Sequence, residues 1–262
     1  MNDRMNVAIV GAGIGGLSAA LALSGRGMHV TVFEEAASPR EAGAGISIPP
    51  NAATLLKRAG FCDALDKIST KSQGLSARTS QGEPVSTPPA SVTMQSYQIH
   101  RVEFLGMLLN AVKATVAFGH RCIGVSETET GTRLTFANGA VHDADVIVGA
   151  DGIHSMVQRA IGLVSRPTSE GIMAYRGLAQ SQRLSWAAEL RGLNMWMGAG
   201  RSLMCFPVSQ GRLINVVAFV PSSRDMEETW YAHGDVKALA SEYEGWDAPV
   251  QDIIAALDQT FL

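Results

Sequence analysis

The segment Val7-Ala-Ile-Val-Gly-Ala-Gly-Ile-Gly-Gly16 decides the fold of this 262-residue chain. Its first four residues form an apolar run that predicts a strand, and Ile14–Ser24 carries alanine and leucine at helical spacing. In the turn between them, Gly11 permits the bend, Gly13 lets backbone approach a pyrophosphate, and Gly16 allows close packing of helix on strand. The helix would offer free N–H groups and a positive dipole end to phosphates.

An acidic residue follows the next predicted strand. Val30–Phe33 is that strand, and Glu34 comes after it at the spacing from Gly11 that a dinucleotide site requires, about 20 residues. A carboxylate there can accept hydrogen bonds from both ribose hydroxyls and would repel a 2′-phosphate, so the pattern predicts FAD or NAD rather than NADP. Glu35 is a candidate adenosine contact, and a solvated surface charge is the alternative.

Composition narrows the class of protein. Hydrophobic residues make up 46% of the chain and charged residues 17%, as in globular proteins. A net charge of -3 without long blocks gives no electrostatic case for a nucleic-acid or membrane partner. The cysteines, Cys62, Cys122 and Cys205, are far apart and odd in number, which predicts no disulfide framework or zinc site and fits a cytoplasmic location. No stretch approaches the roughly 18 apolar residues of a membrane span, and the apolar run after Arg4 is too short for a signal peptide.

Two further segments predict parts of the same site. Arg101 precedes an apolar helical stripe, where a cation is unfavourable against the helix dipole, so an anionic ligand is expected there; a solvated charge is the alternative. Residues 144–152 predict a buried strand ending in an Asp-Gly turn, at the strand end where open parallel sheets bind ligands. A helix is expected over Ser155–Ile161. Because a carboxylate repels phosphate, we expect Asp151 to orient backbone and a neighbouring arginine.

Together these segments resemble the group A flavoprotein monooxygenases, the aromatic ring hydroxylases similar to salicylate hydroxylase. The resemblance covers essentially the whole chain, through Val7–Gly16, Gly43–Ala52, His100-Arg101, Val148–Ser155, Tyr175–Gly177 and Phe206-Pro207. It implies an α/β fold, with a Rossmann-like FAD-binding domain and an inserted, mainly antiparallel β-sheet substrate domain. The expected FAD-binding parts are 1–70 and 99–165, and the substrate parts are 71–98 and 166–262.

The resemblance also implies roles for single residues. The loop from Gly43 to Asn51 would look out over the flavin ring, and an ordinary surface turn is the alternative. Arg101 would pair with the FAD pyrophosphate or the adjoining ribityl, and the backbone of Ile123 would meet the adenine. Ser47 stands where some relatives carry a histidine acid or base, which a serine cannot replace near neutral pH. The predicted cofactor-binding residues are Gly11, Gly13, Ile14, Gly15, Gly16, Glu34, Glu35, Gly45, Ile46, Ser47, Arg101, Ile123 and Asp151.

The last third of the chain predicts an antiparallel meander. Its strands are separated by Gly-containing turns and are expected over 172–178, 193–197, 203–208 and 213–220. Met195, Cys205 and Phe206 are candidate substrate-pocket residues, and plain core is the alternative. Phe206 departs from a tyrosine of some relatives, so with Ser47 no acid or base is evident and the catalytic residues stay unknown. Helices are predicted over 230–244 and 249–257.

The implied activity is FAD-dependent. The parent of this chain would take hydride from NADH or NADPH and insert one atom of dioxygen into a small aromatic substrate. The family's later Gly-Asp turn is not evident, since Asp235 is better explained as a helix N-cap. The alternative is therefore a truncated, catalytically inert FAD-binding fragment, or one half of a pair completed by a C-terminal chain. A homodimer is a further alternative.

Overall fold

The computed structural model describes residues 4–39, 44–72, 74–85, 96–163, 167–222 and 232–262. The chain forms two compact units, Met1–Glu41 with Leu105–Thr168, and Ala42–Phe104 with Ser169–Leu262. Residues 42–70, which we expected in the first FAD-binding part, fall in the second unit, and their part in FAD binding stays a prediction. The reason for their place in the second unit is long-range strand pairing, because β3 (Gly45–Ile48) and β4 (Ser69–Lys71) both pair with β6 (Tyr97–His100).

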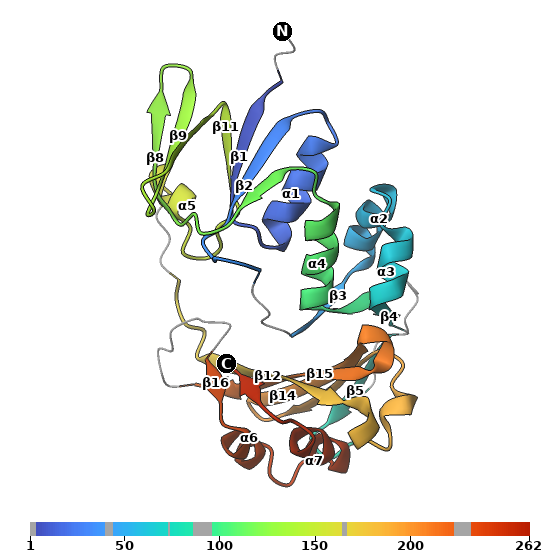
Figure 1. The fold of residues 1–262 in the computed structure, drawn as a ribbon. Coiled ribbons are helices and arrows are strands. Elements are labelled where there is room, and N and C mark those ends of the chain that lie inside the picture. The colour runs from blue at the N-terminus through green and yellow to red at the C-terminus, as the bar shows by residue number, and fades with distance from the viewer. Residues whose placement is uncertain (1–3, 40–43, 73, 86–95, 164–166, 223–231) are drawn as a thin grey trace. The chain divides into compact units, whose positions relative to one another are not determined.

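A parallel sheet forms the centre of the first unit (Figure 1). Its order is β11 (Val146–Gly149), β1 (Asn6–Val10), β2 (His29–Phe33) and β7 (Thr115–Ala117). Helix α1 (Ile14–Ser24) follows β1 directly and buries Leu17 and Ala20. The predicted strand, turn and helix are therefore confirmed.

Strand β11 differs from its prediction as a buried strand. It pairs with β1 and is an edge strand of the sheet as far as the described residues extend. One edge of the strand therefore has no neighbouring strand among the described residues, and Val146 is 40% exposed. The short helix α5 (Met156–Ala160) follows, with Ser155 as its N-cap. The burial prediction was wrong because an apolar run does not reveal whether a strand is central or at an edge.

A three-stranded antiparallel sheet completes the first unit. Its order is β10 (Val141–Ala144), β9 (Gly131–Phe136) and β8 (Cys122–Thr128). Phe136 of β9 packs on Phe33 of β2, with ring centroids 4.6 Å apart, so the two sheets share one core cluster.

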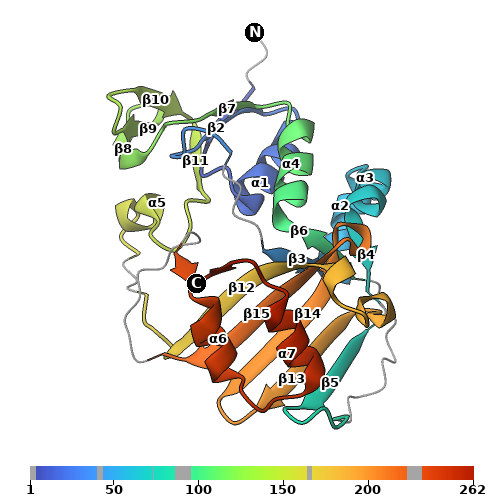
Figure 2. The same ribbon diagram turned by 60° about the horizontal axis from the view of Figure 1, so that its bottom comes forward.

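The second unit contains the predicted meander. The seven-stranded sheet has the order β16 (His233–Gly234), β17 (Thr260–Phe261), β12 (Ile172–Gln180), β15 (Leu213–Pro221), β14 (Arg201–Val208), β13 (Leu193–Gly198) and β5 (Leu75–Thr79). All neighbours are antiparallel except β13 and β5. Figure 2 shows α6 (Val236–Glu242) and α7 (Ala248–Ala255) across one face of this sheet, where they form a common core with it.

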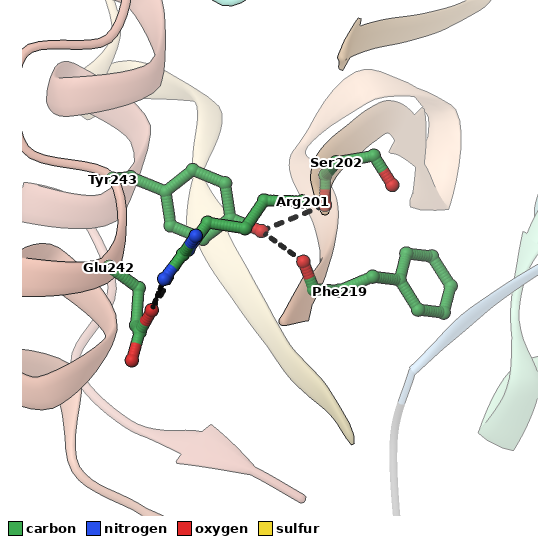
Figure 3. Close-up of polar contacts among 5 residues, drawn as sticks. All are labelled: Arg201, Ser202, Phe219, Glu242 and Tyr243. Carbon is green, nitrogen blue, oxygen red and sulfur yellow. Dashed lines mark hydrogen bonds and ion pairs between the residues drawn. The ribbon is translucent and has the colours of Figure 1, made fainter. Parts of the chain in front are cut away.

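Polar contacts fix α6 to the sheet. Asp235 is its N-cap, as predicted, because the carboxylate accepts a hydrogen bond of 2.8 Å from the Lys237 amide. At the other end, the Tyr243 hydroxyl lies 2.8 Å from the carbonyl oxygens of Ser202 and Phe219 (Figure 3). Arg201 forms an ion pair of 2.6 Å with Glu242 beside it. The helix predicted over 230–244 is shorter than expected, because residues 233–234 form β16 and α6 begins only after Asp235; residues 230 and 231 lie outside the described part of the chain.

The remaining elements of the second unit form a small layer. Strands β3, β6 and β4 make a three-stranded sheet, and α2 (Pro50–Arg58) and α3 (Cys62–Ile68) accompany it. Strands β6 and β4 contact β14. Helix α4 (Arg101–Ala111) follows β6 directly, and the 3-10 helices are η1 (Ser181–Arg183), η2 (Ala187–Glu189) and η3 (Ser209–Gly211).

Within the described residues, no helix combines the length and apolar character that spanning a membrane requires.

Candidate cofactor and substrate sites

Two glycines of the first turn are required by packing. Gly11 has a φ of +102°, and a Cβ added there would lie 2.3 Å from the carbonyl oxygen of Ala150. A Cβ on Gly16 would lie 1.8 Å from the carbonyl oxygen of Gly11. Backbone hydrogen bonds from Gly11 to Phe33 and from Ala150 to Val10 join the ends of β1, β2 and β11. The turn and the Gly149–Gly152 segment are therefore neighbours, as predicted.

The other two glycines face open space. Among the described residues, no atom lies within 4 Å of a Cβ added to Gly13 or Gly15. Gly13 is the N-cap of α1, and no side chain of the described residues caps the first amides of the helix, including that of Ile14. Free N–H groups at an uncrowded helix N-terminus form an anion-binding site. The geometry therefore fits a diphosphate beside Gly13, Ile14 and Gly15.

Glu34 is held at the same end of the sheet. Its carboxylate accepts hydrogen bonds of 2.9 Å from the backbone amides of Ala12 and Ala36. Its own backbone bonds to Ala117 and His120. The half-buried carboxylate is thus fixed next to the glycine-rich turn, whereas Glu35 is exposed. A contact of either residue with ribose or adenosine stays a prediction.

Asp151 caps a helix. Its carboxylate accepts hydrogen bonds of 2.5 Å from the Ser155 hydroxyl, and of 2.6 Å and 3.1 Å from the amides of Met156 and Val157. These bonds satisfy orphan amides at the start of α5. They fit the expectation that Asp151 orients backbone, whereas the expected bond to an arginine and a part in cofactor binding stay predictions.

Ile123 lies at an irregularity in β8. The register with β9 shifts between Cys122 and Gly124, so Ile123 is the extra residue of a bulge, and its side chain is 45% exposed. Burial and the nearby charge of Asp151 raise the pKa of the Cys122 thiol, although a hydrogen bond to Gly124 opposes them. Ile123 therefore lies in the unit that carries the glycine-rich turn, and its contact with adenine stays a prediction.

Arg101 begins α4 in the second unit. Its backbone amide donates to the carbonyl oxygen of Ala44 at 3.0 Å, which ties the helix start to the loop before β3. Burial, and secondarily the positive charge of Arg101, lower the pKa of the Arg176 guanidinium on β12. Two cations therefore lie near each other in this unit. The convergence of Arg101 with Gly13 and Glu34 of the first unit stays a prediction.

The loop that was expected to meet a flavin ring is seated on the large sheet. A Cβ on Gly45 would lie 2.7 Å from the Cβ of Asn215 and 2.8 Å from a ring carbon of Phe206. The Gly45 amide donates to Asn215 Oδ1 at 2.5 Å. Ile46 is half-buried and Ser47 exposed, and residues 40–43 of the loop lie outside the described residues. Only glycine fits at position 45.

The predicted substrate residues do not share one face. Strand alternation and the pairing of Met195 with Met204 place Met195 and Phe206 on the same side of the sheet. Cys205 points the other way and is fully buried in the core that the sheet forms with α6 and α7. This burial raises the pKa of its thiol to about 12. The expectation that Cys205 lines the pocket is therefore corrected, since adjacent residues of a strand face opposite sides.

Sequence reasoning missed polar residues between the two sheets of the second unit. Asn215 is 0% exposed and Gln98 is 1% exposed. Burial also lowers the pKa of His100, against the opposing charge of Glu103. The sequence could have indicated Asn215 as a candidate site residue, because it is the polar residue within the otherwise apolar run of β15.

The geometry of the first unit defines an α/β dinucleotide-binding protein. The sequence profile of a family described as "FAD binding domain" matches residues 4–256. The chain is 32% identical over 269 residues to a 3-amino-4-hydroxybenzoate 2-monooxygenase of Streptomyces platensis, covering 98% of this chain and 67% of the relative. It is 30% identical over 266 residues to a salicylate hydroxylase of Pseudomonas putida, covering 93% and 61%. The crystal structure of HpxO from Klebsiella pneumoniae with FAD and uric acid matches with a TM-score of 0.83 at 26% identity, covering 99% and 67%.

The chain belongs to this FAD-binding family, and the predicted resemblance to FAD-dependent aromatic monooxygenases is confirmed. The predicted fold class is confirmed as well. The chain spans about two thirds of the length of these relatives.

Proposed function

We propose that this chain is an FAD-dependent monooxygenase that hydroxylates a small aromatic substrate with NADH or NADPH and dioxygen. The observation that carries the proposal is the glycine-rich turn, where Gly13 and Gly15 leave open space above uncapped helix amides and Glu34 is fixed alongside. When bound, FAD supplies hydride acceptance and the activation of dioxygen. The protein supplies binding, orientation and exclusion of water.

Each half of FAD would meet a separate set of residues. The amides of Gly13, Ile14 and Gly15 would hold the diphosphate, and Glu34 would accept hydrogen bonds from the adenosine ribose. Arg101 would pair with the diphosphate, and Ile123 would contact the adenine. The loop from Gly45 to Ser47 would carry the flavin ring. Its seating on Phe206 and Asn215 supports this role, because a firmly held backbone can orient a flat ring.

The substrate would lie against the face of the large sheet that carries Met195 and Phe206. Neither of these side chains nor Ser47 titrates near neutral pH, so their contribution would be shape and a low dielectric. Acceptable substrates are small rings with polar substituents, the class to which 3-amino-4-hydroxybenzoate and salicylate belong, as the names of the relatives indicate. The free cysteines, with Cys62 exposed, fit a reducing cytoplasm.

Flavin binding separates this proposal from the inert fragment. The purified protein is reconstituted with FAD, and its visible absorbance is recorded after free flavin is removed. NADH and NADPH oxidation are then followed with a panel of hydroxybenzoates and hydroxypyridines. The proposal predicts bound FAD, stimulated oxidation of a reduced nicotinamide and a hydroxylated product. Colourless protein that cannot be reconstituted argues for the inert fragment.

A further inference from the structure

Asn215 carries a buried hydrogen-bond donor that lacks a partner. The side chain is fully buried on β15, and Oδ1 accepts the Gly45 amide at 2.5 Å. A backbone N–H can only donate, so this bond fixes which end of the amide is oxygen. Nδ2 therefore points away from Gly45, and it has no hydrogen-bond partner among the described residues. An unpaired buried donor is costly, and native proteins usually satisfy it.

The neighbours of this donor on the large sheet are apolar. Asn215 pairs with Phe206 on β14 and with Leu178 on β12, and Val217 follows on the same face of its own strand. The Gly45 backbone approaches from the small sheet. Small-molecule sites are typically lined by apolar and aromatic side chains, with a few polar groups that fix orientation.

The facing sheet carries further unpartnered polar atoms. Thr70 Oγ1, Gln98 Oε1 and His100 Nε2 are buried and lack partners among the described residues. Thr70 pairs with Gln98, and His100 pairs with Gly45, so strand alternation puts all of them on the face that Gly45 presents to Asn215. Four of the five unpartnered buried side-chain atoms among the described residues therefore lie between the two sheets, and the fifth, Thr260 Oγ1, lies on β17.

We propose that Asn215 is a substrate-binding residue, whose Nδ2 donates a hydrogen bond to an oxygen on the aromatic ring while Oδ1 holds the Gly45 loop. This inference rests on the proposed function. The fixed donor requires an acceptor, and the ring oxygen is a hydroxyl or a carboxylate oxygen. One side chain thus orients both the ligand and the loop, so that the position of the ring oxygen sets which substrates fit.

Asn215→Asp tests this by changing one atom. The variant keeps the oxygen that accepts from Gly45 but replaces the donor by an acceptor. If Nδ2 donates to the ligand, the affinity for an oxygen-bearing ring falls by about 10- to 100-fold at about pH 8, the range for a hydrogen bond to a charged group. Burial raises the pKa of the new carboxyl, and once protonated it donates again. The loss should therefore disappear near pH 5.

The probes are salicylate, benzoate and phenol, and their dissociation constants are measured by calorimetry on the FAD-loaded protein. Benzoate and phenol separate the two kinds of oxygen, because each carries one of them. Asn194→Asp is the matched control, since Asn194 is also buried but lies on the opposite face, bonded to Arg78 and Gly192. The strands of the two sheets around Asn215 carry charged or titratable groups that are common to all variants, namely Lys71, Tyr97, His100, Tyr175, Arg176, Arg201 and Cys205.

Asn215→Asp with wild-type affinity for all probes at both pH values would show that Nδ2 serves only an ordered water, and would overturn the inference. A pH-independent loss would do the same, because it indicates damage to the loop. Wild-type protein that holds FAD but binds none of the probes also contradicts the inference, while the proposed function still stands on flavin binding. Failure to hold FAD contradicts the proposed function itself.

Discussion

Replacing Gly13 and Gly16 separately distinguishes a ligand site from a packing requirement. A methyl group added to Gly13 meets no atom of the described residues within 4 Å, and the φ of -70° at this residue suits alanine. Alanine reduces the entropy of the unfolded chain but is a poorer N-cap than glycine, so we expect Gly13→Ala to change the free energy of unfolding by less than about 1 kcal/mol.

Gly16→Ala should behave differently. Its methyl group would lie 1.8 Å from the carbonyl oxygen of Gly11, and the contact is with backbone, which cannot move aside cheaply. Overpacking of this severity costs about 3 kcal/mol or more. For a chain of this size, a loss of about 3 kcal/mol lowers the melting temperature by roughly 6–12 °C.

The assay combines thermal unfolding of flavin-free protein with titration of FAD. We expect Gly13→Ala to keep the wild-type melting temperature but to weaken FAD binding at least about tenfold, or 1.4 kcal/mol, because the methyl group occupies the approach of the diphosphate. Gly16→Ala should lower both the melting temperature and the affinity for FAD. Unchanged FAD affinity in a stable Gly13→Ala protein would refute the assignment of the diphosphate site, and an unchanged melting temperature in Gly16→Ala would refute the packing argument.

Three other changes test the framework around the site. Tyr243→Phe removes the hydroxyl between two strand carbonyls and should lower the free energy of unfolding by about 1–3 kcal/mol, measured by urea titration. An unchanged free energy of unfolding would mean that α6 is held by packing alone. Asp151→Ala removes the acceptor at the start of α5 and should cost about 1–2 kcal/mol, seen as faster hydrogen exchange at Met156 but not in α1. Burial lowers the pKa of His142 below its ordinary 6.5, so the folded state binds fewer protons than the unfolded state and stability should fall as the pH drops through about 6.5. His142→Phe keeps a ring beside Phe33 and should reduce this dependence, while His100, whose pKa burial also lowers, contributes the rest; an identical slope would exclude His142 as a source.

Local patterns predicted the first unit well. The bounds of α1 match those expected, because its start is set by the glycines and its interior by apolar spacing. The position of Glu34 followed from the strand before it. These features depend on residues that are close together in the sequence, so they could be predicted without knowing which distant segments pair.

Features set by long-range pairing were harder to predict. The opposite orientations of Cys205 and Phe206 follow from simple alternation, but which of them faces the helices depends on where α6 and α7 pack. The edge position of β11 and the membership of residues 42–70 in the second unit likewise depend on distant partners. The orientation of the Asn215 amide could not be predicted either, because it is set by a hydrogen bond from Gly45, which lies far from it in sequence.

Equilibrium dialysis of the wild-type chain against FAD tests the central claim most directly, namely that the turn from Gly11 to Gly16 and Glu34 bind this cofactor. The account predicts saturable binding of one FAD per chain, strongly reduced in Gly13→Ala protein that remains folded. Absence of saturable binding by folded wild-type protein would contradict it.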